Sequence, residues 1–218
     1  MENFELHSKW RYRVFHDLFV ELAIERFVEA ENAYIELNQQ ENEHPDGRTY
    51  ELVAIIRKGC TETICFSVMA LESFINTFSA SYISDSFAET IDHLDVPAKW
   101  IVTMHVAKGI ELAKGEKPIQ RIIQCVKRRN SFIHSKSKPI NICKECGGFH
   151  IPQMHLLKDY MVPAYEALKA LEDASLWVSN NWDSGTLNIS IDDMHKKVKS
   201  KFKTVDYTWM FDEPSVMF

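Results

Sequence analysis

The sequence predicts an all-α fold, a bundle of five to six main helices. Apolar residues recur every three to four positions along several stretches, which is the period of amphipathic helices. Glycine and proline are scarce, at seven each among 218 residues, whereas an all-β fold needs turn residues every few positions. Apolar residues make up 45% of the chain, which is ordinary for a globular protein.

Two long helices are expected in the first part of the chain. One spans residues 9–40, with Ser8 as its N-cap, and residues 41–49 form a loop. The second spans about residues 50–83 and is apolar on nearly every side at its centre, which predicts a position in the middle of the bundle. Gly59 within this helix marks a kink or a close contact with a neighbouring helix.

Shorter helices follow in the middle of the chain. Residues 84–94 are polar and predict a loop or a short helical turn. Asp95 as a cap and Pro97 in the first turn open a helix that runs through Lys108. After a connector, another helix is expected to run from Pro118 to about Ser137. The inward stripe of that helix should consist of Ile119, Ile122, Ile123, Val126 and Ile133.

The last third of the chain is expected to contain a loop over residues 139–151 and a long helix over 152–181, bent at Pro163. We divide the chain into a helical bundle domain, residues 1–190, and a C-terminal segment, residues 191–218. The segment holds a lysine-rich helix and an aromatic tail, which we expect to pack on the body or on a second subunit.

The net charge of −6 is unevenly distributed. Residues 1–100 carry 18 acidic and 8 basic side chains, a net of −10, whereas residues 101–150 carry 3 acidic and 10 basic ones, a net of +7. A local basic patch attracts phosphate groups even on an acidic protein. From charge alone, a solvated helix face is the alternative interpretation.

The basic region contains a segment that suits RNA chemistry, Arg129-Asn130-Ser131-Phe132-Ile133-His134. We expect Arg129 on the inward stripe, and Asn130 and His134 four residues apart on one face, converging along an apolar seam. A histidine with a pKa near neutrality exchanges a proton with a ribose 2′-OH or a leaving oxygen, and an arginine neutralises charge on the phosphorus-bound oxygens. The residues expected to contact the RNA backbone are Lys127, Arg128 and Lys136.

The pattern Arg129-Asn130-x-x-x-His134 resembles the signature of HEPN (higher eukaryotes and prokaryotes nucleotide-binding) domains. Residues 70–76 resemble the central helix of bacterial HEPN-like proteins. Lys99-Trp100, followed by a connector with lysine and glycine and then Pro118, resembles the sequence that precedes their Arg-Asn helix. The resemblance covers about residues 50–140.

This resemblance implies a helical bundle that often dimerises, with a composite site built from both subunits. It implies either a metal-independent endoribonuclease of toxin–antitoxin, antiviral or RNA-processing type, or a non-catalytic binder of nucleotides or RNA. By position, Arg129 and His134 would be catalytic, with Asn130 supporting them. Glu72 and Asn76 share one face of the central helix, and we expect them partly buried near the site. The implied partners are RNA, a second copy and an antitoxin or regulatory protein, and no cofactor is required.

Two alternatives stay open. Cys143, Cys146 and His150 offer three zinc ligands on a loop, with His155 as a candidate fourth, so the loop is either a structural zinc site or a reduced loop without a role. Alternatively, the chain is an interaction module in which Arg129 and the residues around it only join helix ends.

The sequence also suggests a compartment. Three of the five cysteines lie inside apolar helical patterns, which does not favour a disulfide framework. No apolar run approaches the roughly 18 residues of a membrane helix, and the N-terminus lacks the pattern of a signal peptide. We therefore expect a cytoplasmic protein that does not act on membranes.

Overall fold

The computed structural model describes residues 2–39, 47–133 and 154–181, with side chains from residue 16 onward in the first range and from residue 157 onward in the last. The regular structure in these ranges consists of six helices, which confirms the predicted all-α bundle. The helices are α1 (Glu2–Gln39), α2 (Gly47–Tyr82), α3 (Asp85–Thr90), α4 (Val96–Lys108), α5 (Lys117–Ile133) and α6 (Met154–Asn181).

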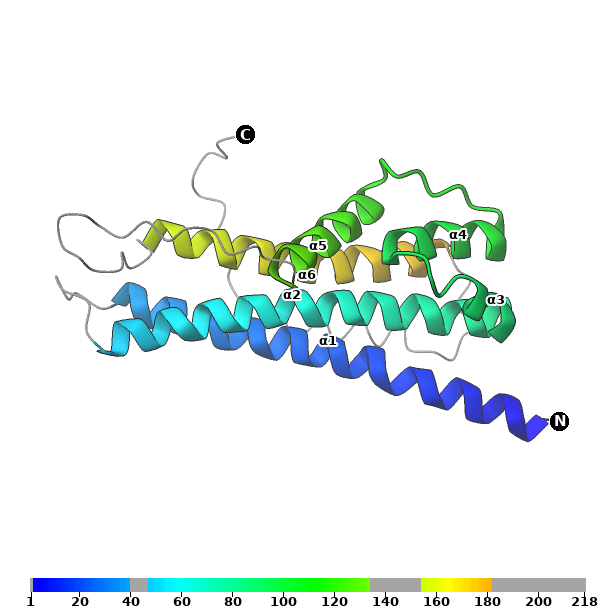
Figure 1. Ribbon diagram of the computed structural model, residues 1–218, viewed down its shortest axis with the longest axis horizontal. Helices are drawn as coiled ribbons and strands as arrows, with labels where there is room; N and C mark the ends of the chain where they lie inside the picture. The colour runs from blue at the N-terminus through cyan, green and yellow to red at the C-terminus, as the bar shows by residue number, and fades with distance from the viewer. Residues whose placement is uncertain (1, 40–46, 134–153, 182–218) are drawn as a thin grey trace.

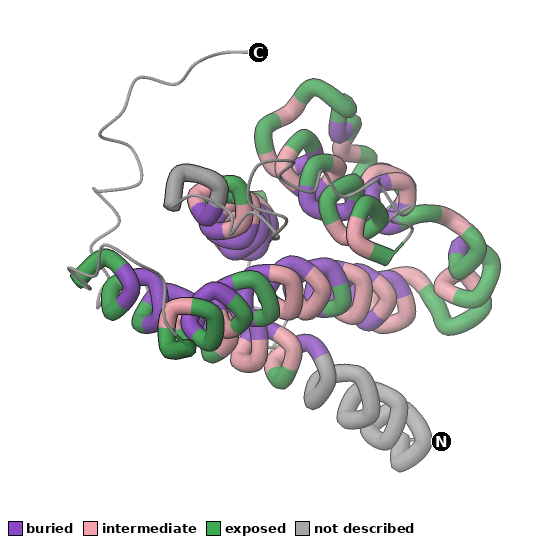
Figure 2. The backbone as a smooth tube through the Cα atoms, turned by 60° about the vertical axis from the view of Figure 1, so that its left-hand side comes forward, coloured by how far each residue is buried: buried purple, intermediate pink, exposed green. Residues whose placement is uncertain are grey.

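Helix α2 is the central element and contacts each of the other five described helices. It forms a long antiparallel pair with α1, and α6 lies along this pair (Figure 1). Helices α3, α4 and α5 gather around the second half of α2, and α5 lies obliquely across the bundle (Figure 1). Buried residues concentrate where the helices face one another (Figure 2). The sequence-based expectation that this helix occupies the middle of the bundle is therefore confirmed.

The seam between α1 and α2 is close enough to require glycine at one position. A Cβ on Gly59 would lie 2.7 Å from the Arg26 carbonyl oxygen and 2.9 Å from the Ala30 Cβ. One turn further along, Thr63 Oγ1 lies 2.8 Å from the Gly59 carbonyl oxygen and 3.2 Å from the Ala23 carbonyl oxygen across the seam. Gly59 thus marks a close contact between helices, one of the two roles expected for it.

Helix α4 is defined at both ends and docks on α2 through specific contacts. Asp95 Oδ1 accepts a hydrogen bond from the Ala98 backbone N–H (2.8 Å), and Gly109 ends the helix with a φ of 68°. The Trp100 Nε1 donates to the Leu71 carbonyl oxygen (3.2 Å), and its ring stacks on Phe74 with the centroids 5.4 Å apart. These contacts fix the position from which the chain continues into α5.

Helix α6 closes the bundle against α1 and α2. The Cys60 Sγ lies 3.3 Å from the Met161 Sδ, and the Arg57 guanidinium lies 5.4 Å from the Tyr160 ring centroid. Pro163 is inside this helix, as expected, and cannot donate a backbone hydrogen bond to the preceding turn.

The observed boundaries agree with most of the predicted ones. The exception is α1, which begins at Glu2, so Ser8 lies within the helix and the prediction that it caps the helix was wrong. The acidic residues Glu2 and Glu5 favour an earlier start, because negative charge stabilises the N-terminal end of a helix. The predicted lysine-rich helix, the aromatic tail and the domain boundary at residue 190 lie outside the described residues.

None of the helices in the described ranges is both long and apolar enough to cross a membrane.

We expect Gly59→Ala to lower the free energy of unfolding by about 2 kcal/mol. The added methyl group overlaps a backbone carbonyl oxygen, and this overpacking outweighs the gain of about 1 kcal/mol in helix propensity. Urea denaturation followed by circular dichroism measures the change. Gly47→Ala is the control, because nothing lies within 4 Å of a Cβ at that position. An unchanged or higher stability of Gly59→Ala would contradict the close seam.

Candidate functional site at the end of helix α5

Helix α5 carries five basic residues and no acidic ones, and these are Lys117, Arg121, Lys127, Arg128 and Arg129. Its buried residues are Ile119, Ile122, Cys125 and Val126, which confirms most of the predicted inward stripe. Ile133 was predicted on that stripe and is 59% exposed, so that prediction was wrong. Because α5 lies obliquely across the bundle (Figure 1), its contacting face shifts along the helix, and Phe132 packs on the core instead.

Arg129 is half-buried on the inward side of α5, as predicted. Its Nε is fully buried and has no hydrogen-bond partner among the described residues. A buried donor without an acceptor costs about 1–3 kcal/mol, more when the group is charged. The position therefore has a stability cost that a ligand with acceptor oxygens would offset.

Two cysteines lie beside this guanidinium, Cys65 on α2 and Cys125 on α5. Burial raises the pKa of the Cys125 thiol to about 12, and burial also raises the pKa of Cys65, while Arg129 acts in the opposite direction on both. Both thiols therefore stay protonated at neutral pH. They neither balance the charge of Arg129 nor provide a thiolate nucleophile.

The structure describes the side chains of some of the other predicted site residues and not of the rest. Asn130 is exposed, so the expectation that it shares a buried seam with Arg129 was wrong. Consecutive helical residues are about 100° apart around the axis, so the two side chains cannot share one narrow stripe. Lys127 and Arg128 are exposed, as a role in binding RNA requires. The residues of the prediction that lie outside the described side chains are His134, Lys136, Cys143, Cys146, His150 and His155.

Glu72 and Asn76 are half-buried on α2, as predicted. The structure places Glu72 against α4, where its Oε1 accepts a hydrogen bond from the buried Lys99 Nζ (3.0 Å). The same ammonium group donates to Asp92 Oδ1 (3.0 Å). Burial acts to lower the pKa of Lys99, but the hydrogen bonds to Asp92 and Glu72 outweigh it, so the pKa is raised. Helix α4 is thereby tied to α2 by an ionic cluster.

Glu72 is seven residues beyond Cys65, a distance of about 10 Å along a helix. Its hydrogen-bond partner in the structure is Lys99, and Arg129 belongs to the neighbourhood of Cys65. Glu72 and Arg129, which were predicted to belong to one site, thus lie at two different places along α2: Glu72 at Lys99 and Arg129 at Cys65. Lys99 positions the helix that precedes α5, and Arg129 lies on α5 itself.

The positive charges at the beginning of α5 are neutralised by α6. Arg121 Nη1 donates to Asp173 Oδ2 (2.8 Å), and its Nε lies 3.5 Å from Glu166 Oε2. Lys117 Nζ lies 3.7 Å from the same Asp173 oxygen. No acidic side chain of the described residues pairs with Lys127, Arg128 or Arg129, so the net positive charge is concentrated at the end of the helix.

A metal site in this part of the molecule would need several His, Cys, Asp or Glu side chains close together. Among the described residues, no group of three or more histidine, cysteine, aspartate or glutamate side chains is placed to hold a metal ion. The proposed zinc ligands Cys143, Cys146 and His150 are not among them, so that alternative stays a prediction.

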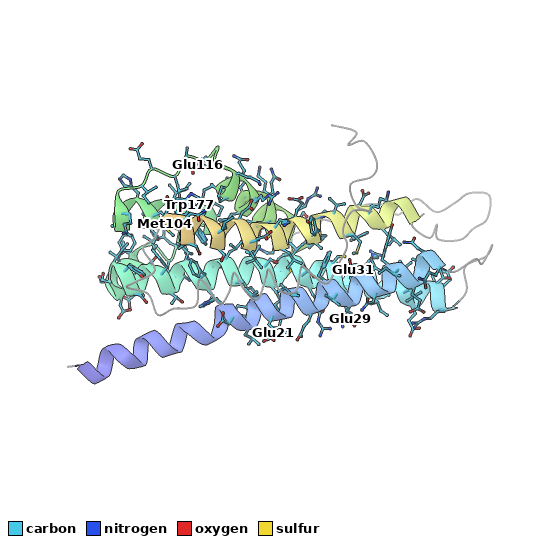
Figure 3. All side chains as sticks on the ribbon, turned by 180° about the vertical axis from the view of Figure 1, so that it is seen from behind. Glu21, Glu29, Glu31, Met104, Glu116 and Trp177 are labelled. Carbon is cyan, nitrogen blue, oxygen red and sulfur yellow. The ribbon has the colours of Figure 1, made fainter. Side chains whose placement is uncertain are left out.

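A buried carboxyl group on α1 was missed by the sequence analysis. Glu31 is buried, its Oε1 has no hydrogen-bond partner among the described residues, and burial raises its pKa to about 7. Figure 3 shows Glu31 on the side of α1 that faces the other helices, whereas Glu21 and Glu29 lie on the opposite edge. Its helical spacing from Phe27 and Tyr34 was a signal that could have placed it in the core.

Comparisons of the chain with protein-family models, with curated protein sequences and with solved structures give no match. The geometry around Arg129 and the resemblance of the segment that contains it are therefore the features that bear on function.

We expect Glu72→Gln to lower the free energy of unfolding more than Asp92→Asn does, by about 1–2 kcal/mol against about 0.5 kcal/mol. The Glu72 side chain is 37% exposed and that of Asp92 is 75% exposed, so solvent screens the second ion pair more strongly. Chemical denaturation of both variants gives the comparison, and Glu89→Gln on the exposed surface of α3 is the control. Equal losses for the two pairs would show that the exposure of the carboxylate does not decide their strength.

The buried Glu31 predicts a pH-dependent stability. Its pKa is about 7 in the folded chain against 4.5 for an ordinary glutamate, so the folded state holds the proton more tightly. Wild-type stability should therefore fall relative to Glu31→Gln as the pH rises from 4.5 through 7, by up to about 3 kcal/mol. Thermal unfolding at pH 5 and pH 8 tests this, with Glu29→Gln as the exposed control. A pH-independent difference would contradict a proton on Glu31.

Proposed function

We propose that the chain is a HEPN-type RNA-handling protein that cleaves RNA as a metal-independent endoribonuclease, with Arg129 and His134 as its catalytic groups. One observation carries the proposal: Arg129 has a buried, unpaired Nε at the end of a helix without acidic residues. A phosphate would provide the acceptor oxygens that this guanidinium lacks, in the two-pronged geometry that arginine favours.

The proposed reaction is an internal transphosphorylation. The ribose 2′-oxygen forms a bond to phosphorus while the bond to the 5′-oxygen of the next nucleotide breaks. His134 takes the proton of the 2′-OH or gives one to the leaving oxygen, and Arg129 stabilises the negative charge that develops on the phosphorus-bound oxygens. The products are a 2′,3′-cyclic phosphate and a 5′-hydroxyl end, and no metal ion takes part.

The neighbouring residues have supporting roles in this proposal. Asn130 is exposed beside Arg129 and orients His134 or a phosphate. Lys127, Arg128 and Lys136 contact the RNA backbone, which gives affinity that falls with salt and does not depend on base sequence.

A second copy of the chain completes the site in this proposal. In a two-fold dimer the same segment of both subunits meets at one interface, so one His134 acts as the base and the other as the acid. Specific activity that falls when the enzyme is diluted below its dimer dissociation constant supports this arrangement.

We expect wild-type protein to cleave mixed RNA in the presence of a chelator and His134→Ala to be at least about 100-fold slower, as for the loss of a general acid or base. Arg129→Ala should lose a similar factor, because it removes stabilisation of the transition state. Gel electrophoresis of labelled RNA measures the rate, and chemical analysis of the ends identifies the cyclic phosphate. His105→Ala is the matched control, because this histidine is exposed on α4.

Two outcomes would contradict the mechanism. Equal cleavage of a substrate with 2′-deoxyribose at the cut site would exclude attack by the 2′-oxygen. RNA binding without cleavage by wild type, unchanged in His134→Ala, would instead favour a non-catalytic RNA-binding module.

A further inference from the structure

A cavity of about 290 Å³ lies between α5 and α6. Lys117, Arg121, Gln124 and Arg128 line it from α5, at spacings of four, three and four residues, so they share one face of the helix. The volume is at the lower end for small-molecule sites, which matches a ligand of the size of one nucleotide.

The opposite wall of the cavity is largely apolar. It consists of about one and a half turns of α6, with Val162, Pro163, Glu166 and Ala167. The buried Cys125 adds a neutral thiol to the α5 side, because burial raises its pKa to about 12. A flat aromatic ring can therefore pack on Val162 and Pro163, while the Glu166 carboxylate of the same wall lies 3.5 Å from Arg121 Nε.

Polar groups free to bind a ligand lie on the α5 side of the cavity. The Gln120 side chain already donates to the Lys114 carbonyl oxygen. Gln124 is exposed and forms no hydrogen bond with the described residues, so its amide has both a donor and an acceptor available. This is the combination that reads the edge of a nucleobase.

The charges around the cavity determine which end of it binds an anionic group. Arg121 is held by Asp173 and lies near Glu166, and Lys117 lies near the same aspartate, so neither offers a full positive charge. Arg128 has no acidic partner among the described residues. An anionic group therefore binds at the Arg128 end of the cavity, which is the end adjacent to Arg129.

We infer that this cavity is a nucleotide subsite for one residue of a single-stranded RNA. The base lies against Val162 and Pro163 with its edge on the Gln124 amide, and the phosphate lies on Arg128. The inference rests on the proposed function, because it adds to the Arg129 site the place where a neighbouring nucleotide binds. Gln124 and Arg129 are about 7.5 Å apart along the helix axis, which one strand can span.

A free mononucleotide has the same chemistry as one residue of an RNA strand, so the test has to separate the two ligands. The 218-residue chain with His134→Ala is titrated into a fluorescein-labelled six-nucleotide RNA in chelator, and fluorescence anisotropy gives the Kd. The same titration is repeated in competition with AMP, GMP, CMP and UMP.

Substitutions in that background test the cavity itself. Val162→Trp fills it from α6, and Leu176→Trp on the same helix is the matched control, since the two side chains are 37% and 40% exposed. Gln124→Leu removes the amide while nearly keeping the volume. We expect Val162→Trp to weaken RNA binding about tenfold, the effect of losing one bound base, and Gln124→Leu to weaken it severalfold. Leu176→Trp should stay within about twofold, as is usual for a surface substitution.

Each outcome decides between the ligands and between the two proposals. Equal affinities of Val162→Trp and Leu176→Trp for RNA, or no RNA binding by the parent protein, would overturn the subsite. Mononucleotides that compete at the same affinity as the oligonucleotide would make it a site for free nucleotides instead. RNA binding that depends on the cavity, together with no cleavage by wild type, supports the subsite and refutes the nuclease proposal. Val162→Trp is therefore also made in the wild-type chain, and cleavage at the wild-type rate by that variant supports the nuclease proposal and overturns the subsite.

Discussion

The fold depends on the central position of α2. Each of the other described helices packs on it, so the polar groups on its contacting faces need hydrogen-bond partners. Three of its buried hydroxyl groups meet this condition within the helix, since Thr63, Thr77 and Ser79 each lie 2.8 Å from the carbonyl oxygen four residues earlier. The buried Ser67 Oγ, by contrast, has no hydrogen-bond partner among the described residues. At Gly59 even a methyl group is too large. The positions of α4, α5 and α6, and with them the candidate site, follow from this central helix.

The division of charge along α5 connects the fold to the proposed function. Acidic residues of α6 neutralise the first turns of α5, and these ion pairs also hold the two helices together. The last two turns carry positive charge that no described acidic residue balances, and such charge attracts a polyanion. A negatively charged strand is therefore drawn to one end of the helix. This end holds both Arg129 and Arg128, and Arg128 lines the cavity.

Periodicity and capping predicted the fold well because both are local properties of the sequence. The sequence analysis placed α2, the Asp95 cap of α4, and Arg129 on the inner face of α5 close to where the structure has them. The pairing of Lys99 with Glu72 joins residues 27 positions apart, and that of Arg121 with Asp173 joins residues 52 apart, so neither leaves a periodic signal. The exposure of Ile133 depends on the angle at which α5 crosses its neighbours. The sequence of α5 alone does not determine that angle. The HEPN resemblance stays a prediction, and so does the role of His134.

The antiparallel pair of α1 and α2 also sets an order of assembly. Its contacts join residues close in the chain, such as Arg48 with Glu36, 12 positions apart, and Thr63 with Ala23, 40 positions apart. The contact of Cys60 with Met161 spans 101 positions, so α6 closes a far larger loop. Loop-closure entropy favours the short-range hairpin first, and the docking of α6 afterwards. During synthesis from the N-terminus, α1 and α2 can therefore pair while α6 is still unmade, and the cavity walls meet only in the last step of folding.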